Sequence, residues 1–262
     1  MRSLIVANWK ANPETASRAA ILARAIEQGI RPYKNAEVII TPPSPFLIPV
    51  QSVIKNVRLG AQDAFWGRTG PHTGEVSWLQ LKGLKIRHVI VGHSERRADI
   101  GETTEMVERK VVALLDNDMI PILCIGETER AADGGAEDGS FAAVADQIRK
   151  ILRAVSKSRV KNLVIAYEPV WAISTTPGAR PDTPDSAFRA MLYIRRILAE
   201  MFGRQAAELV RIIYGGSVTS ANAAGFFAEG HMAGALVGGA SLNPKEFIRI
   251  VQAASLAGPA SK

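Results

Sequence analysis

The stretch Leu4-Ile5-Val6-Ala7-Asn8-Trp9-Lys10 decides between the two folds that the rest of the chain allows. Four apolar residues of strand length run into Asn8-Trp9-Lys10. An open dinucleotide-binding sheet would carry Gly-x-Gly-x-x-Gly after its first strand, and this chain does not. In a closed barrel, a lysine at this place points into the mouth of the ring, where its ammonium can hold a substrate oxygen or phosphate. On its own, a lysine that ends a strand is more often an ordinary surface charge.

Apolar segments of strand length alternate with segments of helical period along the whole chain. Eight strands are predicted, at Leu4–Ala7, Val38–Thr41, Val57–Ala61, His88–Val91, Ile120–Ile125, Leu163–Tyr167, Arg211–Tyr214 and Ala233–Val237. The helical segments include Thr15–Gln28, Glu102–Leu115, Phe141–Val155 and Ser186–Phe202. Such alternation gives a parallel sheet with right-handed crossovers, and eight units close a ring. We therefore expect an α/β protein with one (β/α)8 barrel domain over residues 1–262, and an open doubly wound sheet is the competing fold.

The length and the cysteine content fit this expectation. The 262 residues match the roughly 250 that are typical of one such barrel. Cys124 is the only cysteine, which rules out an intramolecular disulfide, and it lies in the apolar run Met119–Ile125. We therefore expect a buried, inert thiol and a cytoplasmic protein. The four apolar residues near the start are too few for a signal-peptide core, and no apolar run approaches the roughly 18 residues of a membrane span.

The net charge of +7 is spread over the chain without a dense basic block. This distribution argues against a nucleic acid or a membrane surface as partner. It favours an ordinary solvated surface, or mild steering of a phosphorylated metabolite.

A carboxylate follows the sixth predicted strand, in Ala166-Tyr167-Glu168-Pro169-Val170-Trp171-Ala172-Ile173. The apolar loop after Glu168 can close over it. A carboxylate under a roof of Trp171 and Ile173 loses water, which strengthens it as a base and protects reactive intermediates. We expect Glu168 to be a general base.

A histidine follows the fourth predicted strand, in Gly92-His93-Ser94-Glu95. If a helix begins near Ser94, its amide groups disfavour an imidazolium and leave a neutral ring that can polarise a carbonyl. The competing interpretation is a strand-end histidine bonded to the backbone.

Paired glycines follow the seventh and eighth predicted strands, in Tyr214-Gly215-Gly216-Ser217 and Leu236-Val237-Gly238-Gly239. Without Cβ atoms the backbone can approach a ligand, and exposed amides cradle an anion. In eight-fold barrels these two loops often form a phosphate site. A single Gly-Gly usually marks a tight turn, but two of them at these strands predict phosphate binding.

Taken together, the motifs resemble the triosephosphate isomerase family, in the family's order and over nearly the whole chain. The segments that carry the resemblance are Asn8-Trp9-Lys10, Gly60-Ala61-Gln62, Thr73-Gly74-Glu75, Gly92-His93-Ser94-Glu95-Arg96-Arg97, Cys124-Ile125-Gly126-Glu127, Tyr167 to Ile173, Tyr214-Gly215-Gly216-Ser217 and Leu236-Val237-Gly238-Gly239. The resemblance implies an aldose-ketose isomerase of glycolysis and gluconeogenesis, which interconverts dihydroxyacetone phosphate and D-glyceraldehyde 3-phosphate through an enediol(ate).

The resemblance also implies a role for each candidate residue. Glu168 would be the base and His93 the electrophile, while Asn8 and Lys10 would bind substrate oxygens. Glu95 and Tyr214 would support the site. The phosphate would be held by backbone near Ser174, Ser217, Gly238 and Gly239. Nothing in this chemistry requires a metal or an organic cofactor.

The long segment 62–75 after the third predicted strand implies a partner. Loops of this length in compact domains tend to be functional or partner-bound. In the family, this loop reaches into a second subunit near its first-strand lysine, so Gln62 and Thr73 imply a homodimer interface. The aromatic residues Phe65 and Trp66 could instead fold back on their own barrel.

The lid departs from the family's pattern. Where a Gly-Thr-Gly-Lys type of sequence is expected after Ile173, the chain runs from Ser174 to Asp182 and is about three residues longer. Pro177 and Pro181 each fix φ, so the outer lid should be stiffer than a glycine-rich one. We expect intact chemistry with altered closure.

Two other functions compete with the isomerase. A different phosphate-binding barrel enzyme would share the glycine pairs but has no reason to carry Asn8, Lys10, His93 and Glu168 together. A non-catalytic barrel that serves as a scaffold would fit the unusual lid but not the complete set of catalytic side chains.

Overall fold

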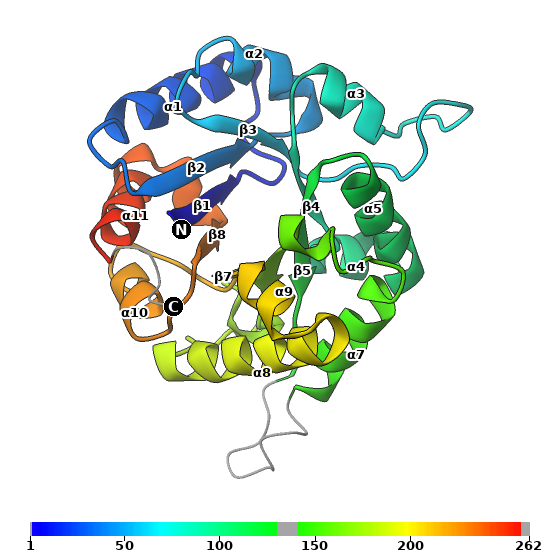
Figure 1. The fold of residues 1–262 in the computed structure, drawn as a ribbon. Coiled ribbons are helices and arrows are strands. Elements are labelled where there is room, and N and C mark those ends of the chain that lie inside the picture. The colour runs from blue at the N-terminus through cyan, green and yellow to red at the C-terminus, as the bar shows by residue number, and fades with distance from the viewer. Residues whose placement is uncertain (1, 130–140, 258–262) are drawn as a thin grey trace.

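The computed structural model describes residues 2–129 and 141–257, and its eight strands form a closed parallel ring (Figure 1). The strands are hydrogen-bonded in chain order, and the last pairs with the first. The predicted closed barrel is confirmed, and the open sheet is wrong. The strands are β1 (Ser3–Asn8), β2 (Ala36–Thr41), β3 (Arg58–Ala61), β4 (His88–Val91), β5 (Ile120–Ile125), β6 (Val164–Tyr167), β7 (Arg211–Tyr214) and β8 (Gly234–Val237).

Helices surround this ring on the outside (Figure 1). They are α1 (Ala16–Gly29), α2 (Leu47–Gln51), α3 (Trp78–Gly83), α4 (Ser94–Ile100), α5 (Thr104–Asp116), α7 (Ala142–Leu152), α8 (Pro184–Phe202), α9 (Arg204–Leu209), α10 (Ala223–Ala228) and α11 (Pro244–Leu256). Short 3-10 turns are η1 (Ser44–Phe46), η2 (Val160–Asn162), η3 (Val170–Ala172) and η4 (Gly239–Leu242). Across the described residues, no helix combines the length and the apolar character needed to cross a membrane.

The predicted elements agree with these bounds to within a few residues at each end. The largest difference is at α7, which ends at Leu152 where the sequence predicts Val155. Helix ends fray and their terminal residues carry weak sequence signals. The sequence also predicts a surface loop at 131–139, which is rich in Ala, Gly, Asp and Glu, and a frayed tail at 257–262. The loop lies outside the described residues, as does the tail beyond Ala257.

Each strand buries both of its faces, because one faces the interior of the ring and the other faces the helices. In β1, Leu4 and Val6 pack inside with Ile39, Ile90 and other inward residues. Ile5 and Ala7 pack outward in the larger cluster beneath the helices. Successive side chains of a strand point to opposite faces, so the continuous apolar runs in the sequence are those of strands covered on both sides. Cys124 is fully buried in the inner cluster, and burial raises the pKa of its thiol well above the usual value.

Side-chain caps fix where several helices begin. Thr15, Thr103 and Thr183 each accept a hydrogen bond from a backbone amide three residues further on. Such caps satisfy amide groups that have no partner within the helix. The cap at Thr183 also sets the end of the lid, since α8 starts at the next residue.

The segment between β3 and α3 has no regular secondary structure except a single bridge between Phe65 and Ser77. Figure 1 shows it extending outward from the ring just before α3. At its base, the Phe65 amide donates to the carbonyl of Val76, and the Trp78 indole donates to the carbonyl of Trp66. The Phe65 ring also packs at a tilt against Trp66 and His72, with ring centroids 4.4 Å and 4.3 Å away. The loop is therefore braced by its own aromatic residues.

Candidate active site

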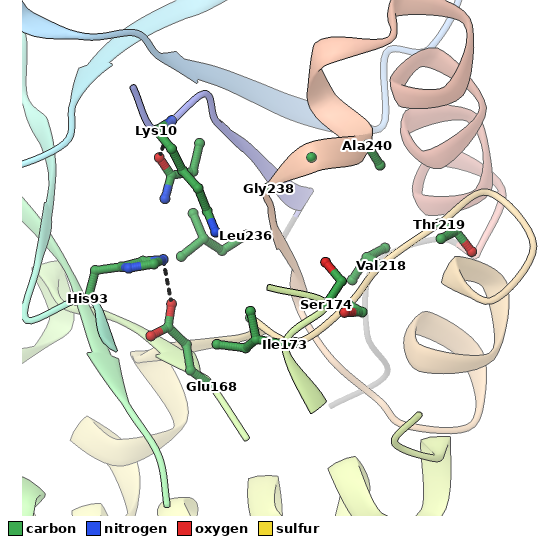
Figure 2. A pocket seen from close by; sticks show the side chains of 15 residues that line it. Lys10, His93, Glu168, Ile173, Ser174, Val218, Thr219, Leu236, Gly238 and Ala240 are labelled. Carbon is green, nitrogen blue, oxygen red and sulfur yellow. Dashed lines mark hydrogen bonds and ion pairs between the residues drawn. The ribbon is translucent and has the colours of Figure 1, made fainter. Parts of the chain in front are cut away.

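A cavity at the carboxyl ends of the strands brings together the residues singled out in the sequence. Because all eight strands are parallel, residues that follow them meet at one rim of the barrel. Figure 2 shows Lys10, His93 and Glu168 pointing toward one another across this cavity. The predicted site residues that line it are Asn8, Lys10, His93, Glu168, Ser174, Ser217, Gly238 and Gly239.

Glu168 is held in place by the backbone around it. Its side chain is 2% exposed, and its amide donates to the carbonyl of Ile125 over 2.8 Å. Oε2 accepts a hydrogen bond from the Ser94 amide at 3.2 Å. Oε1 lies 3.4 Å from Nε2 of His93 but has no hydrogen-bond partner among the described residues. A buried carboxylate oxygen without a partner is costly, and such groups concentrate where a ligand or a proton is to be bound.

Glycine at position 126 is required by the path of the Glu168 backbone. A Cβ atom at Gly126 would lie 1.7 Å from the carbonyl oxygen of Glu168, which no adjustment of a side chain could relieve. The sequence had suggested Gly126 only as part of a motif. The structure gives it a physical reason, because it allows the end of β5 to lie directly against Glu168.

His93 is the N-cap residue of α4. Its Nδ1 accepts a hydrogen bond from the Glu95 amide at 3.3 Å, so the proton of the neutral ring is assigned to Nε2. That nitrogen faces Glu168. The helix begins at Ser94, as the sequence predicts. The Glu95 amide faces the ring, while the Ser94 amide donates to Glu168. A neutral imidazole with Nε2–H directed into the cavity can donate a hydrogen bond to a substrate oxygen.

Lys10 adopts a left-handed backbone conformation with φ of +52°, which is uncommon for a residue with a side chain. Three contacts stabilise it. Its amide donates to Oδ1 of Asn8 at 3.1 Å, and its carbonyl accepts from the Gln62 amide group at 2.8 Å. Its ammonium donates to Oε1 of Glu95 at 2.5 Å. Strained backbone of this kind persists where the surroundings over-determine it, and here it directs the ammonium into the cavity.

The two glycine pairs have different physical roles. A Cβ at Gly215 would lie 2.7 Å from Cγ of Glu168, and one at Gly216 would lie 2.3 Å from the hydroxyl of Tyr214. The first pair is therefore needed for packing within the protein. Gly239 has no atom within 4 Å of such a position, and Gly238 is limited only by the Lys10 side chain at 3.4 Å. The second pair thus leaves open backbone beside the cavity, as an anion cradle requires.

Glu127 was not singled out as a site residue, yet it anchors the start of the lid. Oε1 of Glu127 accepts hydrogen bonds from the Tyr167 hydroxyl at 2.7 Å and from the Trp171 indole at 2.9 Å. Burial raises the pKa of its carboxyl, against the lowering effect of these two hydrogen bonds. The sequence around Glu127 gives no sign of this role, because the two residues that donate to it, Tyr167 and Trp171, lie about forty positions away.

The rest of the lid is tied to the end of β7. The Ser217 hydroxyl donates to the carbonyl of Ala172 at 2.8 Å, and the Tyr214 hydroxyl donates to Oδ2 of Asp182 at 3.2 Å. The side chain of Ser217 is thereby engaged, so only its backbone is directed to a ligand. Tyr214 lies behind the glycines, and burial raises the pKa of its hydroxyl well above the usual value.

Thr73, one of the two predicted interface residues, is exposed in the loop between β3 and α3 and does not line the cavity. Gln62, the other, lies at the base of that loop and bridges the carbonyls of Lys10 and Thr41. Over the described residues, no cluster of three or more His, Cys, Asp or Glu side chains is arranged to hold a metal ion.

Comparison with known proteins agrees with this geometry. A family model described as triosephosphate isomerase matches residues 3–254. The chain is 43% identical over 252 residues to the triosephosphate isomerase of Caldanaerobacter subterraneus subsp. tengcongensis, with 95% of this chain and 98% of that protein covered. It is 41% identical to the protein of that name from Thermoanaerobacter pseudethanolicus, with the same coverage. The corresponding protein of Dictyoglomus turgidum is 37% identical, with 96% and 99% covered. The chain belongs to the triosephosphate isomerase family.

Proposed function

We propose that the chain interconverts dihydroxyacetone phosphate and D-glyceraldehyde 3-phosphate by proton transfer, with Glu168 as the base. The observation that carries this role is the buried Oε1 of Glu168, which faces the cavity beside His93 without a hydrogen-bond partner among the described residues. A base must keep a lone pair available, and partial removal from water increases its strength. The Ser94 amide on Oε2 orients the carboxylate without engaging the reactive oxygen.

The proton moves between two neighbouring carbons of the substrate. Glu168 removes it from the hydroxyl-bearing carbon next to the carbonyl and returns it to the former carbonyl carbon. The hydroxyl proton of the first carbon passes to the former carbonyl oxygen, so that the first carbon becomes the new carbonyl. Negative charge builds up on the substrate oxygen during removal. Nε2–H of His93 donates a hydrogen bond to that oxygen, and the ammonium of Lys10 offsets its charge. Donors fixed in advance around a developing oxyanion lower the barrier without needing to reorganise.

The phosphate is held on the opposite side of the cavity from Glu168. Open backbone at Gly238 and Gly239, together with the backbone of Ser217 and Ser174, provides amide groups without bulky side chains. The lid from Pro169 to Asp182 then covers the reacting carbons. Exclusion of water suppresses loss of phosphate from the enediol(ate).

A coupled assay with each triose phosphate as substrate tests this function. We expect turnover in both directions without added metal or cofactor. A chain that binds dihydroxyacetone phosphate but does not convert it would be a scaffold, and a chain that binds neither would contradict the proposal.

The unusual lid should limit turnover. In the segment from Ser174 to Asp182, the Thr176 hydroxyl donates to the carbonyl of Val170 at 2.8 Å, and the Arg180 amide donates to the carbonyl of Trp171 at 3.1 Å. These bonds add to the stiffness of the two prolines. Lid opening takes microseconds or longer and can limit a fast reaction. Replacing residues 174–182 with a shorter Gly-Thr-Gly-Lys type of lid is therefore expected to raise kcat in the same assay. Unchanged kcat and KM would contradict this account of the lid.

We also propose a homodimer whose interface includes Thr73 and Gln62. The support is the outward extension of the loop between β3 and α3, its exposed Thr73 and the contact of Gln62 with the backbone of Lys10 (Figure 1). A partner packed there would reinforce the backbone of a catalytic residue. Sedimentation of the wild-type chain measures this association, and a monomer at micromolar concentration would contradict it.

Two further assignments belong with this proposal. The pairing of β1 with β8 joins the first and last strands, which supports one barrel domain over residues 1–262. A single, buried cysteine supports a cytoplasmic location. Limited proteolysis tests the single domain, and cell fractionation tests the cytoplasmic location.

A further inference from the structure

A second cavity lies near the amino ends of the strands, at the rim opposite to the candidate active site. It is lined by residues around the end of α1, the start of β2 and the start of β3. Its volume is about 200 Å³, compared with about 120 Å³ for the candidate active site. It therefore has room for a small ligand.

Four cationic side chains line this cavity. Arg2 precedes β1, Arg31 and Lys34 follow α1, and Arg58 begins β3. The backbone brings them together, because Ser3 is paired with Ala36 in the register of β1 and β2 and its amide donates to the carbonyl of Asn35. Within residues 2–129 and 141–257, no carboxylate forms an ion pair with Arg2, Arg31 or Lys34.

The carboxylates nearby are already engaged. Glu37 is shared between Arg58 at 2.5 Å and Arg211 at 2.9 Å. Buried Glu27 accepts hydrogen bonds from the amides of Lys55, Asn56 and Val57. Burial would raise the pKa of Glu27, but these bonds hold it below the usual value.

The histidine at this rim adds no positive charge. Burial lowers the pKa of His88 to about 4, although Glu37 lies 3.9 Å away. The lining of the cavity thus carries four cationic side chains and one carboxylate, Glu37, which leaves an excess of positive charge around a concave surface. Like charges gathered in this way repel one another unless an anion neutralises them.

The cavity wall also has an apolar part. Ile30, Ala36 and Val38 are buried beneath it, and Tyr33 is half-buried at its side. Arginine binds carboxylate and phosphate groups through paired hydrogen bonds, and an apolar floor suits a short carbon skeleton. The cavity is too small for a nucleic acid duplex or a membrane surface to reach its floor.

We propose that this cavity binds a small multivalent oxyanion, a phosphate ester or a polycarboxylate, at a site separate from the isomerase site. Arg31 and Lys34 supply most of the electrostatic attraction for the anion, and Arg2 and Arg58 add positive charge at the other sides of the cavity. Because the site joins the first three strands to α1, its occupant stabilises the fold by mass action.

Calorimetric titration with pyrophosphate at low ionic strength tests the site. Wild-type protein is expected to bind pyrophosphate at this cavity in addition to any binding in the active-site phosphate cradle. In an Arg31→Glu/Lys34→Glu variant, binding at the cavity should weaken by roughly tenfold or more. Arg24→Glu is the control, because Arg24 is exposed on α1, the helix that precedes Arg31 and Lys34, and does not line the cavity.

Isomerase kinetics in the same solutions separate the two sites. Any competitive inhibition of the isomerase by pyrophosphate should have the same inhibition constant in the double variant, while the calorimetric binding at the rim is weakened. The calorimetry needs no turnover, so it remains decisive even if the proposed isomerase activity is absent. If the double reversal does not fold, Arg31→Gln/Lys34→Gln takes its place, with Arg24→Gln as control. Equal binding by wild type and the cavity variant, or an equal loss in the control, overturns the proposal.

Discussion

Replacement of Glu168 with glutamine is expected to lower kcat by roughly 10²–10⁴-fold, which is the usual contribution of a general base. Glutamine has nearly the same shape and keeps an oxygen that can accept the Ser94 amide, so the side chain should remain in place. Its amide cannot take up the substrate proton. Because the buried Oε1 makes no hydrogen bond to any described residue, the fold does not depend on its charge. We therefore expect KM to change far less than kcat.

The control for this variant is Glu229→Gln, which makes the same chemical change at an exposed position. Both variants should have the circular dichroism spectrum and the Tm of the wild type. Steady-state kinetics with glyceraldehyde 3-phosphate then isolate the role of the base. A Glu168→Gln enzyme with full turnover would refute the assignment, and one that is unfolded would show that the carboxylate is structural.

The convergence of Lys10, His93 and Glu168 could be predicted because it follows from topology. Each residue ends a strand, and parallel strands in a closed ring present their carboxyl ends at one rim. The sequence therefore needed to reveal only the eight-fold alternation and the polar residue after each strand. The starting point of α4 was also readable, since His93 and Ser94 stand directly after an apolar strand.

Contacts that depend on side-chain register were not predictable in the same way. Gly215 was expected to face a ligand, yet a Cβ atom there would first strike Glu168. Glu127 accepts a hydrogen bond from the Trp171 indole, and no pattern in the sequence around either residue predicts it. Both depend on distances of a few ångströms between segments far apart in the chain. Strand alternation and length fix the topology but leave such distances open.

Lys110 shows the same limit for charged residues. In the sequence it is one of several charges in a helical segment, and a lysine there is usually exposed. In the structure it lies on the inner side of α5 and is only 2% exposed. The cause is tertiary, because carboxylates from two other segments meet at this point of the helix. The cavity at the opposite rim could not be predicted from the sequence for a similar reason, since Arg2, Lys34 and Arg58 lie far apart in the chain.

Lys110→Met is expected to reduce the free energy of unfolding by about 3–5 kcal/mol, the usual result when one partner of a buried ion pair is removed. The ammonium contacts Asp63 at 2.7 Å and also donates to Glu102. Arg96 pairs with the same two carboxylates, at 2.8 Å and 3.3 Å. Burial raises the pKa of Asp63 despite the opposing effects of Lys110 and Arg96. Without the lysine, two carboxylates would share a single guanidinium in a poorly solvated position.

A double-mutant cycle distinguishes loss of charge balance from loss of packing. Glu102→Gln removes the carboxylate that Lys110 neutralises and keeps nearly the same volume. If charge imbalance is the cause, Lys110→Met/Glu102→Gln should unfold at a higher urea concentration than Lys110→Met alone. Lys150→Met is the control, because its ion pair with Asp146 is exposed on α7 and such pairs contribute little. Independent, additive losses in the cycle would show that the four charges do not act as one network. Because Arg96 belongs to α4, which begins directly after His93, a coupled network would link the stability of the barrel to the position of the proposed electrophile.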